Sequence, residues 1–213
     1  MKIGLTLGSG AARGITHIGV LKALEENNIQ IDYISGSSIG ALIGGAYALG
    51  MPVREIEDIA LNTNWKSMAK IFLPKLSFSA FINDRYLKDF LFDLFSDKTF
   101  ADLKVPLSVA AADIKTGELI TFNSGALLTA IRASISIPIV FTPVITGEHR
   151  LVDGGLVNPT PVDLVKNMGA EKIIAVNLRA FFKEKNTDVN KRKIVSQKTG
   201  EKERLTLNER IEY

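Results

Sequence analysis

Apolar residues early in the chain alternate between short strand-like runs and helical spacing. Residues 3–7 form an apolar run that predicts a buried strand, and residues 31–35 form a second one. Each run is followed by apolar residues at helical spacing, at 15–26 and at 39–49, and the second helix ends at Gly50, a residue favoured at helix C-termini. This alternation predicts an α/β fold, a parallel sheet with helices on both faces.

The middle of the chain, residues 52–102, has an amphipathic pattern that predicts mostly helix. It also contains a cluster of large aromatic side chains. We expect these rings to pack in the core and under a lid, with contact to an apolar substrate as the alternative. They are Trp65, Phe72, Phe78, Phe81, Phe90, Phe92 and Phe95.

Sheet patterns return in the second half of the chain. They predict, in order, a strand at 106–112, a strand at 119–122, a helix at 125–134, a hairpin over 144–152, a helix at 161–167 and a strand at 172–178. Beyond residue 182 the periodic pattern fades.

Charge is distributed unevenly along the chain. The net charge is +3, and residues 183–213 hold nine Lys and Arg against six Asp and Glu, so the remainder is neutral. A neutral body argues against nucleic-acid binding, which needs a basic face. We expect one domain over residues 2–182. The mildly basic tail over 183–213 is predicted to be a solvated helix or disordered, with a membrane-surface or partner role as the alternative.

Cysteine is absent, and the two histidines are His17 and His149. Disulfides, thiolate metal sites and cysteine nucleophiles are therefore excluded, and a histidine-rich metal site is disfavoured. The longest apolar stretch, residues 41–51, is far shorter than the roughly 18 residues that span a bilayer. The first residues lead directly into a strand pattern and do not predict a signal peptide, so we expect a cytoplasmic protein.

The turn Gly36-Ser37-Ser38-Ile39-Gly40 lies between a predicted strand and a predicted helix. A nucleophilic serine must project clear of neighbouring backbone, and glycines two residues before and after it remove Cβ atoms that would collide there. The helix that follows directs its positive N-terminal end toward negative charge developing beside Ser38. The pattern indicates a catalytic serine, with a glycine-rich structural turn as the alternative.

A glycine-rich loop over residues 8–14 joins the first predicted strand to the first predicted helix. Such a loop can direct backbone N–H groups at the oxyanion of a tetrahedral intermediate, with Arg13 steadying it. The alternative is a phosphate-binding loop. The spacing disfavours that alternative, because Arg13 stands where the third glycine of the dinucleotide-binding pattern would be and no Gly-Lys-Ser/Thr follows.

The nucleophile needs a base, and no histidine follows Asp153 to complete the order of an α/β-hydrolase triad. We expect His149 to be a structural or exposed strand residue and His17 to pack or hydrogen-bond near the loop. Asp153 begins the tight turn Asp153-Gly154-Gly155, where small neighbours let another segment approach. A carboxylate is a weak base at neutral pH, but a desolvated site makes it stronger, so Asp153 is the candidate base, with a structural turn aspartate as the alternative.

Taken together and in this order, these motifs resemble the patatin-like phospholipase family in its bacterial form. The resemblance extends over roughly residues 2–180. The matching stretches are residues 7–14, 17–21, 36–40, 112–113, 133–138 and 151–159, with Pro161.

The resemblance implies a three-layer α/β/α fold and a Ser–Asp dyad without histidine, in which Ser38 is the nucleophile and Asp153 the proton acceptor. The oxyanion hole is implied to lie among Gly8, Ser9, Gly10, Ala11, Arg13 and Gly14. The accompanying motif glycines are Gly36, Gly40, Gly154 and Gly155. The implied reaction is hydrolysis of carboxylic esters in phospholipids, lysophospholipids or related lipids through an acyl-enzyme, with no metal and no cofactor.

The chain departs from the family pattern at three positions. Ser9 and Ala11 stand where glycine is frequent, and Ile139 stands where glycine is common after the Ser-Ile-Pro. The chain also stops soon after the last predicted strand, where family members often carry more helix.

Two other functions stay open on the sequence. One is a catalytically idle lipid-binding or regulatory protein on the same scaffold, which the presence of both dyad residues disfavours. The other is a nucleotide-binding α/β protein. The expected partner is a lipid or acyl-ester substrate, with peripheral contact at the inner membrane surface allowed and the oligomeric state left open.

Overall fold

Seven strands form one sheet within residues 1–62 and 79–178, the part of the chain that this computed structural model describes. β1 (Ile3–Leu7) is flanked by two parallel neighbours, β2 (Tyr33–Ser37) and β7 (Lys172–Val176). β3 (Leu107–Asp113) runs parallel to β2. The remaining strands pair antiparallel with their neighbours and are β4 (Leu119–Phe122), β5 (Val144–Thr146) and β6 (His149–Asp153). The predicted α/β fold with a mostly parallel sheet is confirmed.

Two strands share one edge of β3. β2 pairs in parallel with the first half of β3, and its last residue, Ser37, lies beside Ala110. β6 pairs antiparallel with the second half, and its last residue, Asp153, lies beside Ala111. Because β4 pairs along both halves of β3 and takes the other edge, the C-terminal ends of β2 and β6 meet head to head.

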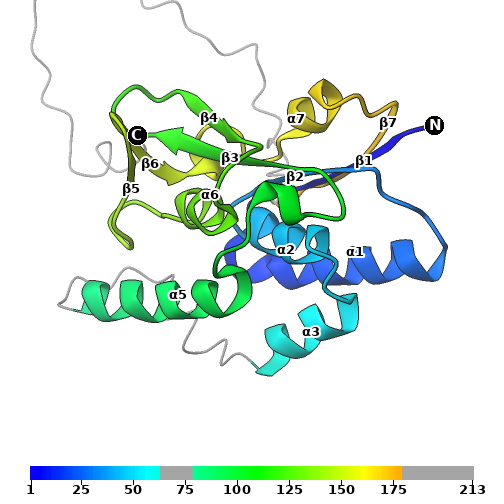
Figure 1. The fold of residues 1–213 in the computed structure, drawn as a ribbon, viewed down its shortest axis with the longest axis horizontal. Helices are drawn as coiled ribbons and strands as arrows, with labels where there is room; N and C mark the ends of the chain where they lie inside the picture. Colours follow the sequence, from blue (N-terminus) through cyan, green and yellow to red (C-terminus); the bar gives the residue numbers. More distant parts are fainter. Residues whose placement is uncertain (63–78, 179–213) are drawn as a thin grey trace, which may run out of the picture. The chain divides into compact units, whose positions relative to one another are not determined.

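Most of the described helices cover one face of the sheet. Figure 1 shows α7 (Val162–Asn167) on one side, and on the other α1 (Ile15–Glu26), α2 (Ile39–Ala48), α3 (Val53–Asn62) and α5 (Ser79–Phe95). α6 (Leu127–Ser134) packs on β3 and β6. None of the helices in the described ranges has the length and apolar character needed to cross a bilayer.

The alternation of side chains along the strands explains why the two layers differ. Leu7 and Ile34 point toward Gly44 of α2 and belong to the main apolar core. Their neighbours Thr6 and Ser35 point to the opposite face, where the Thr6 hydroxyl lies 3.0 Å from the Ser35 hydroxyl, which donates to the carbonyl oxygen before α7 at 2.7 Å. These buried hydroxyls are therefore satisfied.

The strand and helix bounds follow the apolar pattern except where polar residues or glycine interrupt it. β1, β4 and α1 have the predicted bounds. β2 lies two residues later than predicted, because Ser35, Gly36 and Ser37 pair with β3 although they are not apolar. α6 begins two residues late, because Gly125 has a φ of 82° and Ala126 is extended.

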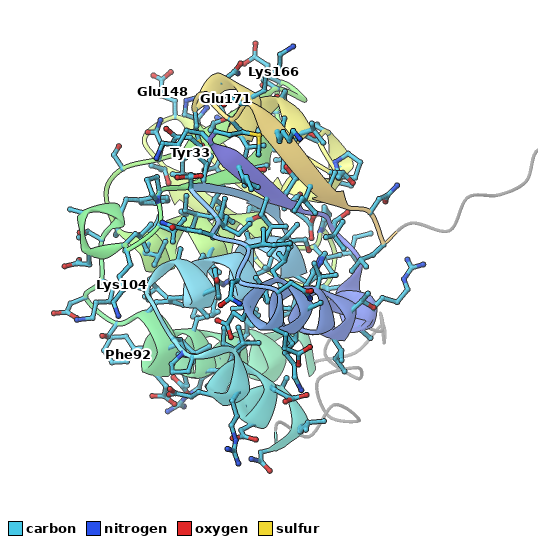
Figure 2. The ribbon with its side chains drawn as sticks, turned by 90° about the vertical axis from the view of Figure 1, so that its right-hand side faces the viewer. Tyr33, Phe92, Lys104, Glu148, Lys166 and Glu171 are labelled. Atoms are coloured by element: carbon cyan, nitrogen blue, oxygen red, sulfur yellow. The ribbon has the colours of Figure 1, made fainter. Side chains whose placement is uncertain are left out.

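The aromatic residues of the middle segment do not share one environment. Phe95 is fully buried and Phe90 packs against the core, as predicted, whereas Phe92 on the same helix is 59% exposed (Figure 2). The core prediction is therefore wrong for Phe92, since it lies on the solvent side of the amphipathic α5. Trp65, Phe72, Phe78 and the side chain of Phe81 lie outside the described residues, as does the predicted tail over 183–213.

Candidate active site

Ser38 occupies a sharp turn between β2 and α2. Its φ of 56° and ψ of −125° lie in a region that residues with a side chain rarely adopt. Such strain persists only where the surroundings enforce it, and it is concentrated at functional sites. Here α2 begins directly after Ser38, whose carbonyl oxygen accepts the N–H groups of Ala41 at 2.9 Å and Leu42 at 3.2 Å.

The two glycines of the turn are required by close backbone packing. A Cβ atom on Gly40 would lie 2.0 Å from the carbonyl oxygen of Leu7, and one on Gly36 would lie 2.6 Å from the backbone nitrogen of Ala41. Backbone atoms cannot move aside as a flexible side chain can. Any residue larger than glycine at either position would therefore collide with backbone.

Ser38 and Asp153 are in direct contact. The Ser38 hydroxyl donates to Asp153 Oδ2 at 2.5 Å, a length typical of a hydrogen bond to an ionised carboxylate. Both residues are buried, with 5% and 8% of their surface exposed. The other carboxylate oxygen, Oδ1, accepts the Gly155 N–H at 2.7 Å, and the Asp153 N–H donates to the Ser136 carbonyl at 2.9 Å. The carboxylate is therefore held on both sides, with one oxygen directed at Ser38.

This contact follows from the shared edge of β3. Ser38 comes directly after the end of β2, and Asp153 is the last residue of β6, so the two meet where those strands meet. Gly154 makes the turn possible, because a Cβ atom there would lie 2.1 Å from the Ala110 carbonyl oxygen. The chain continues past Asp153 in a short 3-10 helix, Gly154–Leu156, in place of the predicted tight turn.

The first four backbone N–H groups of the loop over residues 8–14, those of Gly8 to Ala11, fall into two sets. The Gly8 N–H donates to the Val176 carbonyl at 3.0 Å and the Ser9 N–H to the Pro159 carbonyl at 2.7 Å. For the N–H groups of Gly10 and Ala11, no acceptor is found in the described part of the chain. Of the predicted oxyanion-hole residues, these two therefore have donors that a ligand could use.

The loop lies against both partners of the Ser38–Asp153 pair. Its 3-10 helix, Ala11–Gly14, contacts α2, and a Cβ atom on Gly14 would lie 2.1 Å from Ile39 Cγ1. On the other side, a Cβ atom on Gly155 would lie 2.8 Å from Ser9 Oγ. Three segments distant in sequence thus meet at one place. The Arg13 side chain is exposed, so what holds the loop is its backbone and His17.

His17 holds the loop through a hydrogen bond to its backbone, as predicted. It is fully buried, and its Nε2 lies 2.7 Å from the Gly8 carbonyl oxygen, to which it donates. Burial lowers the pKa of the imidazole, and the hydrogen bond to Gly8 only partly opposes this. The ring is therefore neutral, and its buried Nδ1 has no partner in the part of the chain that the structure describes.

His149 lies away from Ser38, in agreement with its predicted structural role. Its Nδ1 is 2.7 Å from Oδ2 of the buried Asp113. His149 lies four positions before Asp153 on β6, a distance of about 13 Å at about 3.3 Å per residue. The Lys115 N–H and then the His149 ring stabilise the Asp113 carboxylate and lower its pKa. His149 therefore serves the turn after β3.

Two serines of the site were not identified from the sequence. The Ser134 hydroxyl accepts the Ser38 N–H at 2.8 Å, and the Ser136 carbonyl accepts the Asp153 N–H. Ser134 is the last residue of α6, and Ser136 lies two residues later, just before Ile137-Pro138. The only available signal was their place within a stretch shared with a known family, which does not reveal that Ser134 contacts Ser38, 96 residues earlier in the chain.

The chain is similar to known proteins over most of its length. A sequence model described as patatin-like phospholipase matches residues 5–166. An uncharacterized NTE family protein of Mycobacterium tuberculosis is 34% identical over 177 residues, or 83% of this chain and 49% of that protein. Patatin-like phospholipase domain-containing protein 6 of Homo sapiens is 34% identical over 184 residues, or 83% of this chain and 13% of that protein. The chain thus spans about half the length of the first relative and less of the second.

A solved structure shares the fold. The crystal structure of VipD from Legionella pneumophila superimposes with a TM-score of 0.54 at 15% identity, over 73% of this chain and 46% of that one. At this identity the likeness concerns the fold alone.

The close packing at Gly40 predicts a large and specific loss of stability. We expect Gly40→Ala to lower the free energy of unfolding by about 3 kcal/mol or more, because its Cβ would collide with backbone. Gly19→Ala is the matched control. A Cβ at Gly19 meets nothing within 4 Å on the exposed side of α1, so this change should stabilise the protein by about 0.5–1 kcal/mol. Urea unfolding of both variants measures this, and equal effects would contradict the packing.

The buried neutral His17 predicts a pH dependence of stability. Because its pKa in the folded protein is below the ordinary value of 6.5, the unfolded chain takes up a proton first as the pH falls. Stability from this group is therefore complete above pH 6.5 and is lost below it, by at most about 1.4 kcal/mol per pH unit. In urea unfolding at pH 7.5 and 5.5, His17→Gln should lose less stability than the wild type. Equal losses would show that His17 is not held neutral.

Proposed function

Because the chain belongs to the patatin-like phospholipase family, we propose that it hydrolyses carboxylic ester bonds of lipids, with Ser38 as nucleophile and Asp153 as proton acceptor. The 2.5 Å hydrogen bond from Ser38 Oγ to Asp153 Oδ2 carries the proposal. A general base must lie within hydrogen-bonding reach of the proton it removes, and no histidine in the described residues is placed to do so.

In the first half of the reaction, Ser38 Oγ attacks the ester carbonyl carbon and its proton passes to Asp153 Oδ2. The carbonyl oxygen becomes an oxyanion, for which the N–H groups of Gly10 and Ala11 and the N-terminus of α2 provide positive potential. One such donor contributes about 3–4 kcal/mol to transition-state stabilisation. The bond to the leaving oxygen then breaks, and the alcohol leaves with the proton from Asp153.

In the second half, water replaces the alcohol. Asp153 accepts a proton from the water as it attacks the acyl group on Ser38. The bond to Ser38 Oγ breaks, Oγ recovers the proton, and the fatty acid leaves. The fixed carboxylate suits both halves, because Oδ1 stays bonded to the Gly155 N–H while Oδ2 exchanges protons.

The substrates that we propose are phospholipids, lysophospholipids and related lipid esters. The family description and the name of the human relative, both of which contain the word phospholipase, support this substrate class. A catalytically idle lipid-binding protein is the alternative. A fluorophosphonate probe distinguishes the hydrolase from the idle binder, because it labels only an activated serine. Labelling of the wild type that is lost in Ser38→Ala would support the hydrolase.

The dyad predicts a clear order of losses among point variants. We expect Ser38→Ala and Asp153→Asn each to lower kcat for p-nitrophenyl butyrate at least a thousandfold, because one removes the nucleophile and the other the base. His149→Ala should keep activity within about threefold, since His149 contacts Asp113 instead. An inactive His149→Ala beside a fully active Asp153→Asn would refute the dyad.

We further propose that the protein is cytoplasmic and that the surface beside Ser38 and Asp153 contacts the inner membrane surface. Ile139 is 89% exposed and Leu156 is 61% exposed. Ile139 follows Ser136 by three residues and Leu156 follows Asp153 by three, so each lies within about 11 Å of a residue of the site along the chain. Exposed apolar side chains beside a lipid-handling site suit insertion among lipids.

Ile139 offers a test in which stability and membrane binding change in opposite directions. Its φ of 72° favours glycine, so Ile139→Gly should raise the free energy of unfolding by about 1 kcal/mol. The same change should weaken sedimentation with anionic vesicles severalfold, because an apolar anchor is lost. Ile145→Gly is the control, since Ile145 is 71% exposed on β5. Unchanged vesicle binding by Ile139→Gly would exclude Ile139 as an anchor.

A further inference from the structure

The C-terminal end of α6 contacts both Ser38 and Asp153. α6 lies between α5 and the strands β3 and β6 (Figure 1). The hydroxyl of Ser134, its last residue, accepts the Ser38 N–H at 2.8 Å. Two residues later, the carbonyl of Ser136 accepts the Asp153 N–H at 2.9 Å. Both serines are fully buried, so this short segment sets the backbone of Ser38 and that of Asp153 relative to each other.

The hydroxyl of Ser136 is bonded twice to Arg132, four residues earlier. The Arg132 guanidinium donates through Nη1 to this hydroxyl, and the hydroxyl donates to the Arg132 carbonyl at 2.6 Å. The single proton of Ser136 is thus directed at the helix, while a lone pair accepts the guanidinium N–H. A hydrogen bond from a charged donor is roughly twice as strong as a neutral one. Arg132 therefore fixes Ser136, whose carbonyl in turn holds the backbone of Asp153.

Arg132 also contacts the other end of the loop that follows Ser136. Its Nη2 donates to the Thr142 carbonyl at 3.3 Å, and its guanidinium carbon lies 5.5 Å from the centre of the Phe141 ring, within range of a cation–π interaction. The residue is buried, with 6% of its surface exposed. The planar guanidinium binds Ser136 and Thr142 together, whereas an ammonium is a point charge on a flexible stem. The loop over residues 136–142 is therefore closed by one arginine.

We propose that Arg132 is a positioning residue, which keeps Asp153 within hydrogen-bonding reach of Ser38 by fixing Ser136. The proposal rests on the proposed function, because the position of Ser38 and Asp153 affects a rate only if they react. A displacement of about 1 Å in a reacting group lowers a rate about a hundredfold, so loss of the guanidinium should change kcat.

Removal of the guanidinium tests the proposal directly. Arg132→Ala should lower kcat for p-nitrophenyl butyrate about thirtyfold or more and leave KM within about threefold, because the geometry of the reacting groups changes and ester binding does not. Values of kcat refer to folded protein, as measured by circular dichroism. Thr129→Ala is the matched control on the same helix. It leaves both bonds of Ser136 in place, so kcat should stay within about twofold of the wild type.

A surface pocket gives access to Arg132 and makes chemical rescue a second test. The pocket has a volume of about 470 Å³, and Phe92, Thr129, Arg132 and Thr142 are among its lining residues. In Arg132→Ala, a guanidinium ion from solvent can occupy the place of the lost group. Guanidinium chloride, at concentrations that leave the variant folded, should raise its kcat about fivefold or more, whereas sodium chloride should not. Because kcat refers to folded protein, a residue that only stabilises the fold would give no such rescue.

The route through Ser136 is tested by a double-mutant cycle. Ser136→Ala removes the hydroxyl that Arg132 binds and keeps the carbonyl that binds Asp153. It should lower kcat about tenfold, and the double variant with Arg132→Ala should fall within about threefold of Arg132→Ala alone, because both changes break one contact. Guanidinium should not rescue the double variant. Losses that multiply would show that Arg132 does not act through Ser136.

Arg132→Lys keeps the proposal testable if Arg132→Ala does not fold. It retains the charge and the apolar stem, but a single ammonium replaces the fork that binds Ser136 and Thr142, so kcat should fall about fivefold or more with KM unchanged. A folded Arg132 variant whose kcat stays within about twofold of the wild type would show that Arg132 does not position the pair.

The result for the wild type distinguishes this role from the proposed function. If the wild type turns over p-nitrophenyl butyrate and the Arg132 variants do so equally well, only the role of Arg132 is wrong. If the wild type shows no turnover and a fluorophosphonate does not label Ser38, the proposed function fails, and the role of Arg132 fails with it.

Discussion

The head-to-head meeting of β2 and β6 on one edge of β3 is the constraint on which the site depends. It places Ser38 and Asp153, 115 residues apart, at a hydrogen-bonding distance of 2.5 Å. The pair is positioned by backbone, because Gly40 packs on the Leu7 carbonyl and Gly154 on the Ala110 carbonyl. Backbone in a sheet is held by its ladder of hydrogen bonds, so the ends of β2 and β6 fix the place where the two residues meet.

The helix that follows Ser38 couples this geometry to the core. The strain of a φ of 56° at Ser38, of the order of 1–3 kcal/mol, must be offset by interactions elsewhere. α2 supplies them, since almost every residue in it is apolar and buried between the sheet and its neighbouring helices. Gly45 lets it approach α6 closely, as a Cβ there would lie 2.6 Å from Ile131 Cδ1. Because this buried helix begins directly after Ser38, core packing and the position of Ser38 are parts of one structure.

Much of the fold could be predicted from the sequence, because burial and periodicity agree in most elements. β1 and β4 are short apolar runs between turn residues, and their bounds were predicted correctly. The predicted bounds of β2 were two residues too early, because its C-terminal half is Ser35-Gly36-Ser37, which becomes strand only by pairing with β3. For the site, the glycine spacing around Ser38 and the absence of a histidine after Asp153 indicated the residue types. The contact between them, and the support from Ser134 and Ser136, depends on pairing between distant strands, to which local patterns are insensitive.

The hydrogen bonds of Gly8 and Ser9 determine which of the following loop residues are candidates for the oxyanion hole. Both backbone groups of Gly8 are engaged, its N–H by the Val176 carbonyl and its carbonyl by neutral His17, and the Ser9 N–H is engaged by the Pro159 carbonyl. Gly10 and Ala11 are thus the first loop residues whose N–H groups remain for a ligand. Because the Ser9 N–H is bonded to the Pro159 carbonyl, the serine at this position, where glycine is frequent, leaves the proposed donors of Gly10 and Ala11 unchanged. Ala11 has a φ of 48°, so alanine costs about 1–2 kcal/mol there, yet its N–H is as good a donor as that of glycine. The chemistry of this loop therefore depends on which N–H groups the fold leaves available, and the number of its glycines matters less.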